Sequence, residues 1–247
     1  MPIVAADILF NLSANHQESD AGTQGGARNA TGRVLDDQFS AAAQPDVVSD
    51  SASDTQNLTI TGRLASGVID TETLAVDGVT PVLFTKTFER ILKLVLASPA
   101  VGVITVKEGD DGTTRHTFAI AEDEARMLFY DAAAEAAGGS PVIRYEKVFV
   151  ENGHATLSAL ALTLELTTDP RTDYDIATAD ALDDSESVAN RITAPTSVSA
   201  FGKGPLACVN TDLDPGEAQG LWVRQTLAEG TSPAIDEPVV TVDFNTA

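Results

Sequence analysis

Hydrophobic and polar residues alternate most regularly in the second half of the chain. Within 141–169, every second residue from Leu160 to Leu166 is a leucine, and the residues between them are small or polar. Such alternation places one face of a β-strand in a core and the other in water. Asn152–Gly153, a dipeptide typical of a type I′ turn, precedes this run. The pattern therefore predicts two strands joined as a hairpin.

Two more strands are predicted near the C-terminus, at 221–227 and 238–244, because each carries apolar residues on one face. The only tryptophan, Trp222, lies on the opposite face of the first strand, beside Arg224. It either fills a second hydrophobic layer, lies half-buried under a loop, or is exposed to a partner. Trp and Arg are the residue types that most often anchor protein interfaces, so both are candidate interface residues.

The middle of the chain also favours strands. Short β-type runs separated by Gly, Asp and Pro fill 58–85, and 101–121 is typical of a hairpin whose turn is 108–113. Between them, 87–97 has apolar residues at helical spacing, but we interpret it as a strand because β-type runs flank it on both sides. The segment 121–139 has helix-forming residues, acidic residues at its start and glycines at its end, and it is predicted to be either a helix or a loop.

The N-terminal region has a different composition. Residues 5–12 are predicted to form a first strand, whereas 13–57 are rich in Gly, Ala, Ser, Asn and Asp. Such a segment cannot bury enough apolar surface to fold alone, so it is predicted to be a disordered leader or an extended arm laid across something else. Its one apolar cluster, 33–39, would attach the arm to the rest of the molecule.

Composition limits both the core and the partners. The 247 residues suffice for one large β domain or two small ones, and an aromatic content of 5% predicts small cores of Val, Leu and Ala. The chain has 37 acidic and 15 basic residues, a net charge of −22, and no Lys/Arg cluster. Because nucleic-acid binding depends on cations that neutralise phosphates, we expect no nucleic-acid partner. Adaptation to a salty medium is an alternative cause of so acidic a surface.

The N-terminal residues contain no basic segment, and their apolar run is too short for a signal peptide or a membrane span. We therefore expect a protein that is made in the cytoplasm and has no membrane partner. The single cysteine, Cys208, excludes an intramolecular disulfide and is expected to be a small buried thiol.

No motif typical of catalysis is present in the sequence. His16, His116 and His154 lie far apart, in a polar segment, a predicted hairpin strand and a predicted turn. The sequence contains no nucleophile elbow, Walker loop or dinucleotide-binding fingerprint. We therefore predict that the protein is not an enzyme.

Paired and clustered aspartates are the other candidate chemistry. Calcium needs six to eight oxygen ligands, and the acidic stretch 173–186 offers several of them, but without the spacing of an EF-hand. Solvated loop carboxylates are the simplest interpretation, so no metal or other cofactor is predicted. The aspartates concerned are Asp36–Asp37, Asp110–Asp111, Asp183–Asp184, Asp173, Asp175 and Asp180.

Three segments resemble a family of tailed-bacteriophage virion structural proteins. Asp7–Ser13, "DILFNLS", is similar to the family's opening "DIxFxLSGG", although "LSANHQ" stands in place of its glycine pair. Residues 24–39, "QGGARNATGRVLDDQF", stand where the family has an "LGG…LFD" stretch. Asp214–Thr231, "DPGEAQGLWVRQTLAEGT", resembles the closing "LAPGxAxGxWVRxTVPAGT". These are β-strand patterns rather than active-site signatures.

The resemblance implies a fold and excludes chemistry. Residues 58–136 resemble the small immunoglobulin-like modules inserted in phage head and tail proteins. The expected fold is all-β: a discontinuous β-sandwich in which the N-terminal strand and extended arm (1–57) join a C-terminal sandwich (137–247), with the immunoglobulin-like β module (58–136) inserted. Members of such a family have no cofactor and no catalytic residues.

Within a virion, the negative charge favours an outward position, away from packaged DNA. We expect an outer capsid decoration (cement) protein that bridges subunits of the major capsid protein and forms a homo-oligomer, a trimer or a dimer. Removal of 1–40 would then abolish capsid binding and leave the remainder folded. Alternatives are a tail, neck or baseplate component in contact with other virion proteins, or a carbohydrate-binding surface module. The candidate interface residues are Trp222, Arg224, Arg28, Arg33 and Phe39.

Overall fold

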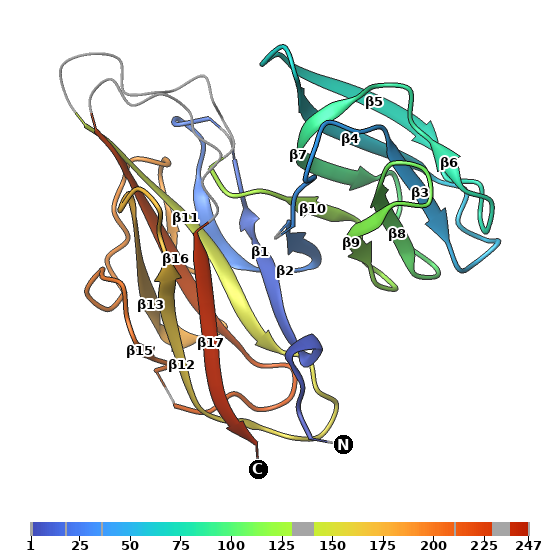
Figure 1. The fold of residues 1–247 in the computed structure, drawn as a ribbon. Helices are drawn as coiled ribbons and strands as arrows, with labels where there is room; N and C mark the ends of the chain where they lie inside the picture. The colour runs from blue at the N-terminus through green and yellow to red at the C-terminus, as the bar shows by residue number, and fades with distance from the viewer. Residues whose placement is uncertain are drawn as a thin grey trace. The chain divides into compact units, whose positions relative to one another are not determined.

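The computed structural model confirms an all-β protein (Figure 1). Its one described helix is a single 3-10 turn, Ala5–Asp7. The chain divides into two compact units: unit 1 comprises Met1–Asn29 with Phe129–Ala247, and unit 2 comprises Ala30–Leu128. The structure describes residues 2–17, 19–35, 37–129, 141–209, 211–228 and 238–246.

Unit 1 is discontinuous in sequence because its first strand pairs with strands from the end of the chain. β1 lies between β11 and β2 in the sheet order β13-β16-β11-β1-β2, and it runs antiparallel to β11. The short strand β14 pairs with β2. The bounds are β1 Ile8–Asn15, β2 Gln24–Val34, β11 Val142–Asn152, β13 Tyr174–Leu182, β14 Ser187–Val188 and β16 Ala218–Leu227.

A second sheet of unit 1, in the order β15-β12-β17, forms the other layer of the sandwich (Figure 1). Its central strand carries the leucine alternation: Leu162, Leu164 and Leu166 are buried, as predicted. A bulge around Ala161, whose φ is 52°, interrupts the pairing with β17, and Leu160 is only half-buried. The bounds are β12 Ala159–Thr168, β15 Leu206–Ala207 and β17 Val239–Thr246.

The predicted hairpin at Asn152–Gly153 is wrong. The strands on either side of it, β11 and β12, belong to different sheets. The buried Asn152 side chain donates to the carbonyl oxygens of Leu157 (2.8 Å) and Leu213 (2.9 Å), and the Gly153 N–H donates to the carbonyl oxygen of Asp7 (2.7 Å). These bonds hold a connection that crosses from one layer to the other, which a two-residue turn could not do.

Unit 2 contains two sheets around one core. One sheet has the order β10-β7-β4-β5, with the last residues of β2 parallel to β10, and the other has the order β6-β3-β8-β9. The core between them includes Ile60, Phe88, Ile104 and Phe118. The bounds are β3 Pro45–Ser49, β4 Asn57–Leu64, β5 Ile69–Ala75, β6 Val82–Leu83, β7 Phe88–Leu96, β8 Ile104–Glu108, β9 Thr113–Phe118 and β10 Glu124–Arg126.

Two local predictions in this unit are confirmed. The segment at 87–97 forms strand β7 rather than a helix, and β8 and β9 form an antiparallel hairpin. Of the segment 121–139, the described part contains the short strand β10 and no helix, while 130–139 lie outside the described residues.

The extended arm at 13–57 is not present as predicted. Residues 24–34 form β2 and 45–49 form β3, both paired within sheets. Backbone pairing does not need apolar side chains, and the glycines of β2 allow close packing, so a polar segment forms a strand here and Gln24–Gly26 are buried. The division at Ala30 also assigns 30–57 to unit 2. Because β1 and the first residues of β2 are paired strands of unit 1, and the last residues of β2 belong to unit 2, we expect removal of 1–40 to disrupt both units rather than detach an arm.

Candidate functional site

Trp222 is fully buried, with 0% of its surface exposed, so it is not an exposed interface anchor. It packs with Tyr145 and Val188, and Val198 and Phe201 close this cluster. Leu221 and Val223, on the opposite face of β16, are buried as well. Trp222 therefore fills a second hydrophobic layer, which was one of the alternatives open from the sequence.

A buried lysine lies beside this layer. Lys147 is directly opposite Trp222 in the β11–β16 pair, and its Nζ is 5.6 Å from the indole ring. It forms an ion pair with Asp184 and donates to the carbonyl oxygens of Asp184 (3.0 Å) and Gly26 (3.2 Å). Burial lowers the pKa of Lys147, and the pairing with Asp184 partly offsets this effect. The lysine binds segment 184–186 to β2, and no sequence pattern indicated it.

The other candidate interface residues also make contacts within the protein. Phe39 belongs to the core of unit 2. Arg28 forms an ion pair with Glu151 (2.6 Å), and Arg33 forms one with Glu122. Arg224 forms an ion pair with Asp175 and lies over the ring of Phe201, 5.0 Å from its centroid. The three arginines keep partly exposed side chains, whereas Phe39, like Trp222, is not available to a partner.

A buried ionic cluster forms the polar part of unit 1. Glu146, which is 1% exposed, forms ion pairs with Arg191 and with His16 (3.2 Å). Burial alone would raise the pKa of the Glu146 carboxyl, but Arg191 and His16 lower it to about 2. Nearby, Arg144 binds the Asp20 carboxylate through two nitrogens, at 2.9 and 3.3 Å. The Glu146 carboxylate is thus held in the folded chain by partners from two distant segments.

The histidines and the cysteine do not converge on one site. His116 belongs to unit 2, whereas His16, His154 and Cys208 belong to unit 1. Burial and the charge of Arg33 lower the pKa of His116 to about 4. The Nδ1 of His154 accepts two backbone N–H groups of its own turn. Burial raises the pKa of the Cys208 thiol to about 12, which makes it unreactive.

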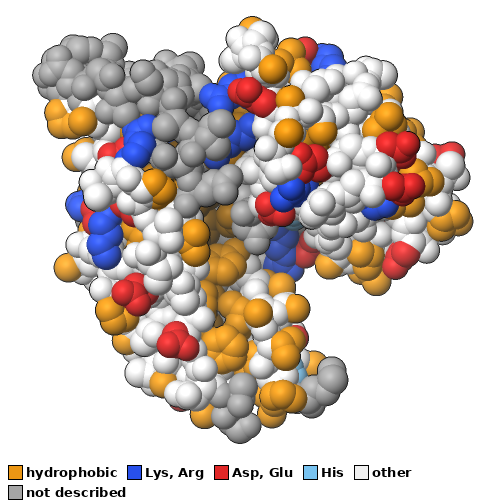
Figure 2. All heavy atoms as spheres, in the orientation of Figure 1, with side chains coloured by type: hydrophobic (Ala, Val, Ile, Leu, Met, Phe, Trp, Pro, Cys, Tyr) orange, Lys and Arg blue, Asp and Glu red, His pale blue; other side chains and the backbone are white. Residues whose placement is uncertain are grey.

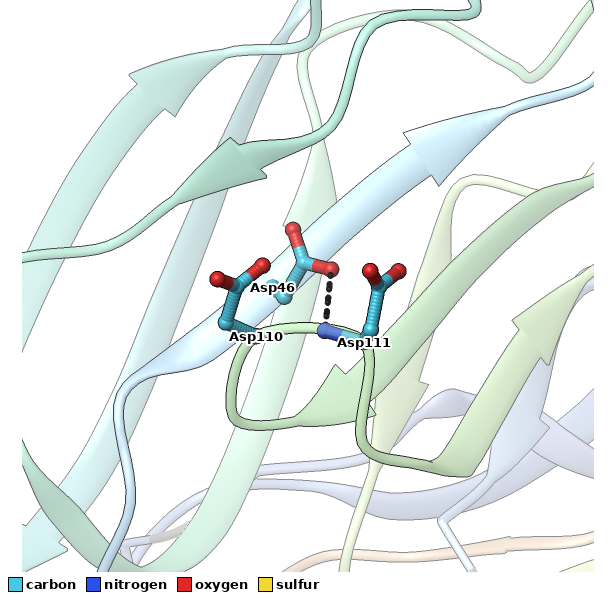
Figure 3. Close-up of side chains that lie close together, drawn as sticks. All are labelled: Asp46, Asp110 and Asp111. Carbon is cyan, nitrogen blue, oxygen red and sulfur yellow. Dashed lines mark hydrogen bonds between the residues drawn. The ribbon is translucent and has the colours of Figure 1, made fainter.

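The one group of described residues able to hold a metal ion lies in unit 2 (Figure 3). Asp110 and Asp111 come from the turn between β8 and β9, and Asp46 comes from β3, which pairs with β8. One ligand oxygen from each carboxylate lies within 4.8 Å of the other two. The sequence indicated the Asp110–Asp111 pair, but Asp46, 64 residues before Asp110, joins it only through strand pairing.

The turn directs these carboxylates to one side of the hairpin (Figure 3). Asp111 has a φ of 51° and Gly109 a φ of 80°, so the backbone is left-handed on either side of Asp110. The Asp111 N–H donates to Oδ2 of Asp46 over 3.4 Å. Lys107 is a nearby cation, with its Nζ 3.4 Å from Oδ1 of Asp111.

On the face shown in Figure 2, acidic and basic side chains are interspersed, and hydrophobic side chains are distributed among them. Among the described residues, no helix is long and apolar enough to span a membrane. No family model matches the chain, and no curated protein or solved structure is significantly similar to it.

Proposed function

We propose that this protein is a non-enzymatic structural component of a tailed-phage virion, and specifically an outer capsid decoration protein. The contact between Gly25 and Trp222 is the observation that carries the proposal. Gly25 lies in the second segment of the family resemblance and Trp222 in the third, almost 200 residues later, and the two pack against each other in unit 1. The first segment forms β1, next to β2 in the same sheet. The first segment, the start of the second (24–29) and the described part of the third thus belong to unit 1, whereas 30–39 belong to unit 2.

The organisation of unit 2 also supports the proposal. It is an all-β unit that begins within β2, ends before β11 and has its own core, which is the arrangement that an inserted immunoglobulin-like module would have. Surface insertions of this kind are tolerated because the host domain keeps its own contacts. With a net charge of −22, the protein would be repelled from packaged DNA, which favours the outer surface of a head.

Binding to the major capsid protein would use strand edges rather than Trp222 or Phe39. β17 ends one sheet of unit 1 and β5 ends one sheet of unit 2, in the order of the described strands. Each edge carries exposed apolar residues, Val239 on β17 and Ile69 on β5. An exposed strand edge offers unpaired N–H and C=O groups to a neighbouring chain, which also suits a homo-oligomer.

Immunogold labelling of intact virions tests the proposal, with an antibody raised against the unit 2 residues 30–128. Label over the whole head, with hundreds of copies per particle by quantitative mass spectrometry, is the expected result. Label at one vertex or along the tail, with a few copies, would overturn the decoration role and support a tail, neck or baseplate component. A protein absent from purified particles would overturn the virion proposal, and a glycan array would then test the carbohydrate-binding alternative.

A further inference from the structure

We propose that Asp46, Asp110 and Asp111 form a calcium-binding site that fixes the β8–β9 turn to strand β3. The three carboxylates meet at one point although they come from two separate parts of the sequence (Figure 3). This inference concerns unit 2 alone and does not depend on the proposed role in a virion.

The state of Asp46 is the observation that points to a ligand. Its side chain is 1% exposed, and its Oδ1 is a buried atom with no hydrogen-bond donor among the described residues. Within the described ranges, its other oxygen, Oδ2, accepts one bond, the long one from the Asp111 N–H. A buried carboxylate oxygen without a donor costs free energy, because it has lost its water and gained nothing in exchange. A cation bound at Oδ1 would remove this cost.

The charge of the cluster has the sign that a cation needs. Three carboxylates face one another, whereas Lys107 is the cation that contacts one of them, over 3.4 Å, and it reaches Asp111 rather than Asp46. Like charges held this close repel each other. A divalent ion would neutralise the two negative charges of the cluster that Lys107 does not neutralise.

Calcium is the ion that the donor set favours. All three ligands are carboxylate oxygens, which suit hard cations rather than zinc. Two oxygens on opposite sides of a calcium ion are roughly 4.6–5.2 Å apart, because each Ca–O distance is about 2.3–2.6 Å. The oxygens here lie within 4.8 Å of one another, so one ion can reach all of them. Magnesium needs shorter distances of about 2.0–2.1 Å and a stricter octahedron.

The exposure of the turn determines how tightly we expect calcium to bind. Asp110 and Asp111 are exposed, so water would complete the coordination and the site would be weak. Sites of this kind, with few protein ligands on an open turn, are expected to bind with a Kd on the order of 0.1–1 mM. Such a site would be filled in media rich in calcium and empty in a cytoplasm.

Isothermal titration of the full chain with CaCl2 tests the site, at an NaCl concentration that keeps the protein folded and screens diffuse binding. We expect one calcium ion per chain. Asp110→Asn and Asp111→Asn, which change exposed side chains, should each weaken binding by about tenfold or more, and Asp46→Asn should abolish it. Asp77→Asn is the matched control, because Asp77 is another exposed turn aspartate of unit 2 and should leave binding unchanged.

Two results would overturn the site. One is the absence of saturable calcium binding up to about 10 mM, ten times the upper Kd expected here. The other is binding that Asp110→Asn and Asp77→Asn reduce equally, which would mean that calcium is only a diffuse counterion of the acidic surface. Circular dichroism of each variant ensures that a loss of binding is not a loss of folding, and MgCl2 in place of CaCl2 should give at least tenfold weaker binding.

Discussion

Gly25 and Trp222 are in contact at a distance that leaves no room for a side chain on the glycine. A Cβ atom on Gly25 would lie 2.8 Å from Cη2 of the Trp222 indole and 2.7 Å from the carbonyl oxygen of Glu186. Gly25 also has a φ of +85°, where residues other than glycine are strained. The single tryptophan thus occupies a position made for it by a glycine in a distant part of the chain.

Gly25→Ala is therefore expected to destabilise unit 1 by roughly 2–4 kcal/mol, from backbone strain and overpacking together. The measurement is the free energy of unfolding in urea. Gly216→Ala is a matched control: its φ is +83°, but nothing lies within 4 Å of the added Cβ. Gly216→Ala should lower the free energy of unfolding only by the cost of backbone strain, about 1 kcal/mol. Equal losses in the two variants would contradict the close packing on Trp222.

Trp222→Ala should cost about 3–5 kcal/mol, because it removes the largest side chain of a buried layer and leaves a cavity. Thermal unfolding followed by circular dichroism would detect the change. If Trp222 instead contacted a partner at the surface, the variant would keep the stability of the wild type and lose only binding.

Lys147→Met should destabilise the protein by roughly 3 kcal/mol, because it leaves the Asp184 carboxylate and several backbone carbonyl oxygens without their donor. Lys93→Met is the comparison, since Lys93 and Glu124 form an ion pair (3.3 Å) in which both side chains are partly exposed, by 29% and 25%. Exposed pairs contribute about 0–1 kcal/mol. Urea unfolding of both variants distinguishes a buried ammonium from a surface one, and similar values for the two would exclude the role assigned to Lys147.

Acid should weaken the protein partly through His116. Its pKa is lowered to about 4 in the fold, from an ordinary value of 6.5, because burial and Arg33 disfavour the charged ring. Between these values the unfolded chain binds a proton that the folded chain does not, so stability falls as the pH decreases from 6.5 to 4. The loss is about 3 kcal/mol in all.

The control for this titration is His116→Phe, which keeps an aromatic ring against Phe118 and cannot be protonated. The unfolding free energies of the wild type and of His116→Phe, measured from pH 7.5 to 4, should diverge below pH 6.5, where only the wild type loses the contribution of His116. Glu146 and Glu108 have pKa values lowered to about 2, so their contribution is lost only below about pH 4.5. Parallel curves would show that His116 does not titrate in this way.

The candidate site was only half visible in the sequence. Asp110 and Asp111 stood out as an adjacent pair in a predicted turn, and the hairpin that carries them formed as expected. Asp46 did not stand out, because it lies in a segment without a clear strand pattern. The pairing of β3 with β8 joins Asp46 to the turn. Strands pair through backbone groups that every residue has, so the sequence did not reveal that β3 and β8 are partners.

The sequence by itself determined the local structure of strand β12 and of the β8–β9 hairpin, where alternating side chains and a turn indicate strands. Strand β7 has apolar residues at helical spacing, and only the β-type runs on both sides of it indicated a strand. The tertiary structure alone decided which strands share a sheet. It separated β11 from β12 at Asn152, included the glycine-rich start of β2 in unit 1, and buried Trp222. The physical reason is that burial of a polar, glycine-rich strand depends on its partners, and the partner of Gly25 lies almost 200 residues away along the chain.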